Sequence, residues 1–430
     1  MVQYQMNDKK IIHAWAMFDW ANSVYSLIIS TAIFPIYYLA YTPEKIRLFD
    51  IEFTNSALYT FSVSFSFIFI ALFSPLFSGI ADYSGRRKFF LRIFTFIGSV
   101  SCMLLYWFDD SSLYLLGTIG FILATIGAGG SSVFYDSYLP LIVTEDRYND
   151  VSARGFTYGY IGSVILMVVI LVMGAKPDIF GLPDDTSAYR IGFFMVGIWW
   201  LGFAQYTLFH LPQDQQIPFT RSVLVNGYKE LITAFYRIRK SVQIKRFLAS
   251  FFFYSAGVQT VIYVATIFAS KELGFESTEL IIIVLIIQLV AIFGAWLFSN
   301  VANSRGNKFS LMTMIIIWIL ICLGAYFTYS KLAFYFLAAL VGMVIGGIQS
   351  LSRATYSKLL PEKDHDTTSY FSFYDVLYKV AVVGGTFLFG FVENVTSNMR
   401  YSVLILAFSF VIGLIIMSFV DFHTKGKIPA

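Results

Sequence analysis

Residues 78–88, with the sequence Ser-Gly-Ile-Ala-Asp-Tyr-Ser-Gly-Arg-Arg-Lys, form a short basic loop between two long apolar runs. A related loop, residues 299–308, reads Ser-Asn-Val-Ala-Asn-Ser-Arg-Gly-Asn-Lys and also lies between apolar runs. Three residues recur at matching positions: Ser78, Ala81 and Gly85 return as Ser299, Ala302 and Gly306. The same displacement carries Tyr135, Leu139 and Pro140 onto Tyr356, Leu360 and Pro361. Because the same difference in residue number relates both pairs of motifs, we infer that one half of the chain is a duplicate of the other. This arrangement is typical of membrane transporters.

The composition places the chain in a membrane. Of its 430 residues, 57% are hydrophobic and 13% are charged, whereas soluble domains average about 25% charged residues. About twelve apolar runs reach the roughly 20 residues that a spanning helix needs. They lie near residues 14–40, 54–80, 89–108, 113–138, 155–175, 189–210, 246–269, 278–300, 309–329, 332–356, 369–392 and 400–422. Because spanning helices satisfy their own backbone groups, we expect an all-α integral membrane protein with twelve transmembrane helices.

The distribution of basic residues predicts the orientation. Most of the 30 Lys and Arg residues fall in segments on the same side as the N-terminus, and such segments are cytoplasmic as a rule. An even number of helices then places both termini in the cytoplasm. The same bias accounts for the net charge of +4 without a nucleic-acid partner. We expect a plasma membrane, the inner membrane if the cell is bacterial.

Three segments are expected. Residues 1–210 and 246–430 each hold six of the apolar runs, and residues 211–245 are more polar. Within the polar segment, Tyr228, Leu231, Phe235 and Ile238 recur at helical spacing, which favours an amphipathic helix on the cytoplasmic membrane face. This helix is either a lipid-anchored linker or a docking site for a partner.

The first basic loop resembles the signature between helices 2 and 3 of the major facilitator superfamily. The matching residues are Ala81, Asp82, Gly85, Arg86 and Arg87, while Ser78, Ile80 and Tyr83 depart from the pattern. The resemblance implies two pseudo-symmetric six-helix bundles around a central cavity. The physics can also be argued from the residues themselves. Glycine permits a turn with positive φ, and an aspartate at a helix end can face the N-terminus of another helix, where negative charge is favoured.

A charged latch is expected around this loop. In the superfamily an acidic residue near the inner end of helix 4 completes a charge relay with the loop, and Asp136 occupies that place here. We therefore expect Asp82, Arg86 and Asp136 to hold the outward-open state. The duplicate has Asn303 and Ser357 instead of the two acids. The alternative is ordinary positive-inside charge.

A second gating contact is proposed between Arg154, at the start of helix 5, and Asp375, at the corresponding position of helix 11. Attraction between them near the inner helix ends would help to close the inner gate. Ordinary positive-inside placement of Arg154 is the competing explanation.

The first helix carries an acidic residue one to two turns inside the membrane. Asp19 is followed by Asn22 and Tyr25 on nearby faces of the same helix. A carboxylate at that depth is costly unless it is paired, protonated or hydrated, so a functional role is the first hypothesis. The alternative is an interfacial Asp that caps the helix start.

Helices 7, 10 and 11 carry the other candidate substrate residues. Asp375 and Lys379 are four residues apart and share a helix face. Gln349 and Arg353 interrupt the apolar run of helix 10, and Gln259 interrupts that of helix 7. Lys and Arg side chains suit a substrate carboxylate or phosphate. The alternative is a salt-bridge cluster that ties helices 10 and 11 together.

Within the superfamily the chain resembles one branch along nearly its full length, the vacuolar-effluxer-like branch of an autophagy-linked amino-acid effluxer. Some relatives carry an acid where Ala256 stands here. The matching motifs lie at residues 19–23, 135–140, 152–163, 253–260, 346–353 and 373–379.

The resemblance implies secondary transport of a small polar solute, an amino acid or a related metabolite, by alternating access. We expect proton coupling through Asp19, import rather than export, and a functional monomer in membrane lipid. The sequence shows no spacing typical of a metal site, a catalytic nucleophile or an ATP-binding loop, so we expect neither cofactor nor enzyme activity. A lipid or lysolipid flippase of the same fold and a non-transporting sensor or scaffold remain alternatives.

Overall fold

The computed structural model describes residues 5–48, 51–213, 216–217, 221–361, 367–396 and 398–421. In these ranges, eleven helices are long and apolar enough to cross a membrane, and a bent pair at the start of the chain makes a twelfth span. The chain is therefore an integral membrane protein with the expected twelve-helix architecture.

The first half contains helices of three kinds and one hairpin. Its α-helices are α1 Lys9–Val24, α2 Phe34–Tyr41, α3 Asn55–Ser84, α4 Arg87–Leu104, α5 Tyr114–Asp136, α6 Leu139–Ile142, α7 Tyr148–Ala175 and α8 Asp185–His210. The π-helix η1 spans Tyr25–Ala32, and short 3-10 turns cover Leu105–Trp107, Ser111–Leu113, Glu145–Arg147 and Pro177–Phe180. Strands β1 Lys45–Leu48 and β2 Ile51–Thr54 pair antiparallel.

The linker and the second half are entirely helical where they are described. The linker helix is α9 Arg221–Lys240. The second half comprises α10 Val242–Leu273, α11 Ser277–Arg305, α12 Asn307–Phe327, α13 Lys331–Leu359, α14 Thr367–Thr396 and α15 Met399–Ser418.

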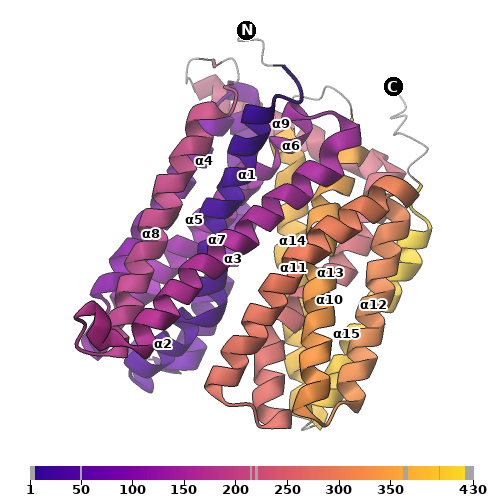
Figure 1. The fold of residues 1–430 in the computed structure, drawn as a ribbon. Helices are drawn as coiled ribbons and strands as arrows, with labels where there is room; N and C mark the ends of the chain where they lie inside the picture. The colour runs from indigo at the N-terminus through magenta and orange to yellow at the C-terminus, as the bar shows by residue number, and fades with distance from the viewer. Residues whose placement is uncertain are drawn as a thin grey trace.

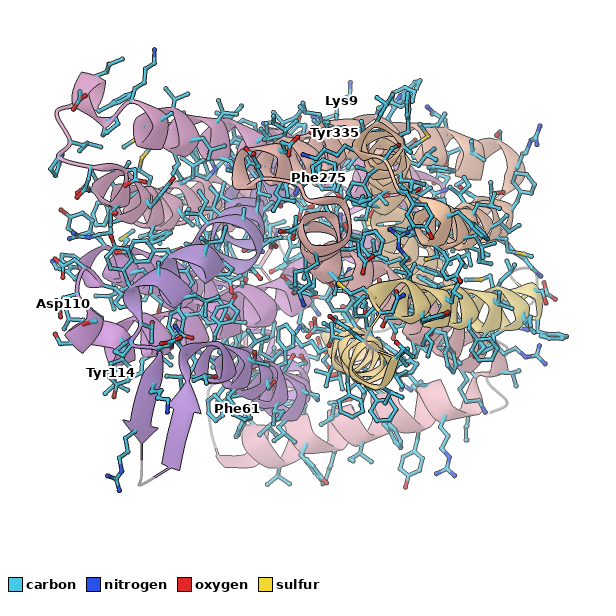
Figure 2. The ribbon with its side chains drawn as sticks, turned by 90° about the horizontal axis from the view of Figure 1, so that it is seen from below. Lys9, Phe61, Asp110, Tyr114, Phe275 and Tyr335 are labelled. Carbon is cyan, nitrogen blue, oxygen red and sulfur yellow. The ribbon has the colours of Figure 1, made fainter. Side chains whose placement is uncertain are left out.

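The two halves lie side by side, the first coloured indigo to magenta and the second orange to yellow in Figure 1. Each half packs around its own cluster of buried apolar side chains. The start of α1 and the end of α15 lie at the same end of the molecule, at the top of Figure 1, which we call the terminal end. Figure 2 views the molecule from the opposite end, where Phe275 and Tyr335 pack edge to face.

The duplicated loops both have a positive φ at the matching glycine. Gly85, between α3 and α4, has φ of 65°, and Gly306, between α11 and α12, has φ of 86°. L-residues with a side chain rarely adopt these angles, so glycine is required at both turns. The expected positive φ at Gly85 is confirmed.

The first transmembrane helix differs from the uniform helix that its apolar run predicts. α1 passes into the π-helix η1, and α2 then bends by 45° relative to the preceding segment. Pro35, two residues after the break at Ile33, lacks the amide donor that would continue the helical pattern. The hairpin β1–β2, visible as two arrows in Figure 2, is a second departure from the all-α expectation.

Candidate functional site

A cavity of about 400 Å³ lies between the two halves. Side chains from both halves line it, and they include all eight residues that the sequence singled out for substrate or proton binding. These are Asp19, Asn22, Tyr25, Gln259, Gln349, Arg353, Asp375 and Lys379. The structure thus brings together residues that are far apart in the sequence, whereas their roles in binding stay a prediction.

The cavity extends from its floor towards the end opposite the terminal end. On the first helix its lining begins at Asp19 and reaches Thr31, and this helix starts at the terminal end. On α13, which runs in the opposite direction, the lining begins at Val341 and stops at Arg353. Asp19 and Arg353 therefore form the floor, and the halves meet beyond it at the terminal end.

Arg353 joins the halves at the floor of the cavity. Its Nη1 donates to Asp136 Oδ1 at 2.9 Å, and its Nη2 lies 3.3 Å from Asp19 Oδ2. Nε and Nη2 also donate to the hydroxyl and carbonyl oxygens of Ser152 at 2.9 and 3.0 Å. Arg353 belongs to α13 of the second half, and its three partners belong to the first. Each donor of the planar guanidinium thus faces an acceptor across the boundary between the halves.

Aromatic rings enclose this guanidinium. Its centre lies 4.6 Å from the ring of Trp15 and 4.5 Å from that of Phe156, and Arg353 is only 3% exposed. Tyr135 stacks on Trp15 and donates to Asp19 Oδ2 at 2.8 Å. A desolvated cation between π faces and carboxylates interacts more strongly with both than it would in water.

The remaining acidic candidate forms a local pair. Asp375 Oδ1 lies 2.5 Å from Lys379 Nζ, one helical turn further along α14. This pair agrees with the i, i+4 spacing in the sequence. Arg353 does not join it, because its carboxylate partners lie on α1 and α5. The proposed tie between the tenth and eleventh spans through Arg353 is therefore wrong.

The cavity carries one more acid than base. Asp19, Asp136 and Asp375 line it together with Arg353 and Lys379, and its other lining residues are uncharged at neutral pH. An unbalanced carboxylate in a buried site is costly unless it binds a proton or a cation. The charges of the site thus favour a positively charged ligand or a proton.

The neutral polar groups add acceptors to the wall. Tyr25 shares a hydrogen bond with Thr125, and Gln349 Oε1 accepts from Tyr160 at 2.9 Å. Within the described ranges, three residues that line the cavity each have a buried oxygen without a hydrogen-bond partner: Asn22 Oδ1, Gln288 Oε1 and Asp375 Oδ2. All three are acceptors, so the cavity wall has unused capacity for N–H or O–H donors. The sequence reading missed Tyr160 and Gln288.

Close packing of α1 on α7 depends on glycines of the 152–163 motif. A Cβ on Gly155 would lie 2.4 Å from Asp19 Oδ2, and one on Gly159 would lie 2.3 Å from Ser23 Oγ. A Cβ on Gly162 would lie 2.9 Å from the carbonyl oxygen of Trp20. These glycines let the helix that carries Asp19 approach α7 closely.

The first signature loop binds the second half at the terminal end. Asp82 accepts from the backbone amides of Thr368 at 3.3 Å and Ser369 at 2.7 Å, both in the first turn of α14. It thereby caps the helix N-terminus, as its place in the sequence predicted. Arg87 pairs with Asp82 at 2.9 Å and donates to the Thr368 hydroxyl at 2.6 Å.

The expected pairing of Asp136 with Arg86 of the signature loop is wrong. The carboxylate is held by Arg353, whereas Arg86 reaches the carbonyl oxygen of Ile217 in the linker. The pair that Asp136 forms therefore belongs to the cavity floor and not to the signature loop.

The expected contact between Arg154 and Asp375 is also wrong. Arg154 is exposed on α7 and donates to Tyr158 at 2.9 Å, while Asp375 pairs with Lys379. Asp375 lines the cavity, whereas Arg154 is not among its lining residues.

The duplicate loop makes its own contact across the halves, which the sequence reading missed. Asn303 accepts from Asn149 at 2.9 Å and donates to Asp150 at 2.6 Å, at the start of α7. Asn149 and Asn307 exchange two hydrogen bonds of 2.8 and 2.9 Å. Asn303 is the residue of the duplicate loop that matches Asp82, and this match was the signal in the sequence that could have located the contact.

Comparison with known proteins agrees with the architecture. The profile described as "Vacuole effluxer Atg22 like" matches residues 7–428. A Bacillus subtilis protein, "Uncharacterized MFS-type transporter YxiO", is 33% identical over 418 residues, covering 97% of this chain and 96% of the relative. "Autophagy-related protein 22" of Saccharomyces cerevisiae is 26% identical over 411 residues, covering 83% and 76%.

Solved structures share the fold at low sequence identity. The Escherichia coli fucose:proton symporter FucP aligns with a TM-score of 0.69 at 14% identity, covering 96% of this chain and 98% of its own. The human organic anion transporter MFSD10 aligns with a TM-score of 0.70 at 10% identity, covering 96% and 100%.

Proposed function

The chain belongs to the family of Atg22-like vacuole effluxers, a branch of the major facilitator superfamily, and on that premise we propose that it is a proton-coupled carrier of a small polar solute. Membership establishes a membrane transporter of the secondary type. The solute class that we propose is an amino acid or a related metabolite with an amine group. The observation that carries this proposal is the excess carboxylate of the cavity beside three unpaired acceptor oxygens.

The ligand chemistry follows from these groups. An ammonium group supplies N–H donors of the kind that Asn22 Oδ1 and Asp375 Oδ2 lack, and its charge balances the third carboxylate. The Lys379 ammonium, which holds Asp375 through one donor, has further donors for a substrate carboxylate. A solute that carries both groups is thus complementary to the α14 pair.

The proton acts at the floor in this mechanism. A proton that enters through the cavity and neutralises Asp19 weakens its attraction for Arg353. Arg353 then retains Asp136 as its charged partner, so that one of its two ionic links between the halves is lost. The halves separate at the terminal end and close at the other, which is alternating access. With the termini in the cytoplasm, this cycle imports solute across the plasma membrane.

The test is uptake into proteoliposomes. A panel of labelled amino acids and related metabolites is supplied with and without an inward proton gradient, and we expect the gradient to drive accumulation. Asp19→Asn should abolish gradient-driven accumulation while counterflow exchange persists, because the residue can no longer gain or lose a proton. Asp178→Asn removes an exposed carboxylate from a connecting turn and should behave as the wild type.

Other outcomes would replace the proposal. Uptake that ignores the gradient in the wild-type protein would contradict proton coupling. A ligand-induced thermal shift without uptake would favour a sensor. Movement of labelled lipid alone would favour a flippase.

A further inference from the structure

The linker helix α9 bridges the two halves at the terminal end. Near its start, Gly227 meets α3 backbone to backbone, and a Cβ on Gly79 would lie 2.2 Å from the Gly227 carbonyl oxygen. Asn226 donates to the Tyr83 hydroxyl at 2.8 Å. Near the end of the helix, Ile238 packs into the apolar cluster of the second half. The helix is therefore attached to both halves at once.

The bridge joins the same two helices that Asp82 joins. Tyr83 directly follows Asp82 on α3. Phe235 of α9 contacts Phe373 of α14 with ring centroids 5.7 Å apart, about one turn beyond the Ser369 amide that Asp82 binds. Separation of α3 from α14 at the terminal end must strain or break one of the two α9 attachments.

The outer face of α9 has the chemistry of a membrane interface. Tyr228 and Tyr236 are 55% and 57% exposed, and Lys229, Arg239 and Lys240 are exposed beside them. Helical spacing places Lys229, Tyr236 and Lys240 on the side opposite Gly227 and Ile238, with Tyr228 and Arg239 on the flank beside them. Glu230, the acidic residue of positions 225–240, lies on the flank and is half-buried. Aromatic rings with several cations and no facing carboxylate suit the headgroup layer of an anionic bilayer.

We propose that α9 is an anionic-phospholipid-binding strap that holds α3 and α14 together and so stabilises the state closed at the terminal end. Bound lipid keeps α9 in the plane of the interface, where its inner face meets both halves. Anionic lipid therefore favours the closed state, and loss of the basic face removes that preference. The mechanistic consequence rests on the proposed alternating access, whereas lipid binding itself does not.

The experiment measures the terminal end directly in the full chain. Spin labels are placed at the exposed positions Asp146 and Arg305, one in each half, after both buried native cysteines, Cys102 and Cys322, are replaced by Ala. Double electron–electron resonance distances are compared in nanodiscs of phosphatidylcholine and of phosphatidylcholine with phosphatidylglycerol. We expect anionic lipid to lower the terminal-open population by roughly fivefold, the effect of one basic residue at such a surface.

Matched variants decide the assignment. Lys229→Gln with Lys240→Gln should remove the lipid effect and leave the distances in phosphatidylcholine unchanged. Lys9→Gln with Lys10→Gln removes equal charge from the exposed start of α1 and should keep the lipid effect. Identical distance distributions in both lipids, or equal loss in both double variants, would overturn the proposal. A lipid effect in a protein that fails every uptake assay would preserve the strap and reject the proposed transport.

Discussion

Arg353 shows why an arginine is required at the cavity floor. Its fork reaches Asp136, Asp19 and Ser152 in different directions, and a lysine ammonium cannot cover the same set of acceptors. From the sequence we could recognise the residue as costly inside a membrane. Its partners could not be found in that way, because they lie on three other helices and no local spacing encodes them.

Arg353→Lys should keep the positive charge but lose part of the contact between the two halves. At least two charge-assisted hydrogen bonds disappear, each worth roughly 1.5–3 kcal/mol. We expect uptake to fall by about tenfold or more and spin labels at the terminal end to report a larger open population. Arg154→Lys is the matched control, because Arg154 is exposed and outside the cavity. Near-normal uptake by Arg353→Lys would show that the fork geometry is dispensable.

Among the structural elements, the sequence could predict features that depend on neighbours along one helix or loop. These are the apolar runs, the loop glycines and the Asp82 cap. The docking of α9 on α3 could not be predicted, because it depends on which backbone surfaces meet in three dimensions. Gly79 and Gly227 are ordinary small residues until the fold brings them together. The contacts of the candidate cavity residues were hidden for the same reason.

Helix packing between α1 and α7 leads to a prediction in which no polar side chain is itself replaced. In Gly155→Ala the new methyl group would meet Asp19 Oδ2 at 2.4 Å and Arg353 Nη2 at 3.0 Å. Overpacking of this kind typically costs about 1–3 kcal/mol, and here the displaced groups are the ionic pair itself. We expect strongly reduced uptake with a folded, monodisperse protein.

Gly202→Ala is the control for this change, because no heavy atom lies within 4 Å of the added Cβ. It should leave uptake and thermal stability near the wild-type values. Equal behaviour of the two alanine variants would mean that α7 can move away from α1 without harm to the site.

At the scale of the whole molecule, the two duplicated loops hold the terminal end with unequal strength. The first uses a buried ion pair, in which Arg87 is 3% exposed and Asp82 caps α14. The second uses amides: Asn303 takes the place of Asp82, and the acid lies across the boundary at Asp150, which is exposed. Duplication thus kept the position of each contact and changed its chemistry, so the closed state depends chiefly on the first loop.

Exchange of the two residue types tests this asymmetry. Asp82→Asn weakens the bonds that Asp82 accepts from the Thr368 and Ser369 amides across the boundary, and hydrogen bonds to a charged group are worth about 1.5–3 kcal/mol each. These bonds exist in the closed state alone, so their loss raises the terminal-open population by roughly tenfold or more. Asn303→Asp places a second carboxylate beside Asp150, but exposure to solvent screens the repulsion, so we expect only a small opening. Spin-label distances across the terminal end measure both, and Asn303→Asp with Asp150→Asn should restore the closed population. A larger effect at Asn303 than at Asp82 would show that the amide contact, and with it the second half, controls closure.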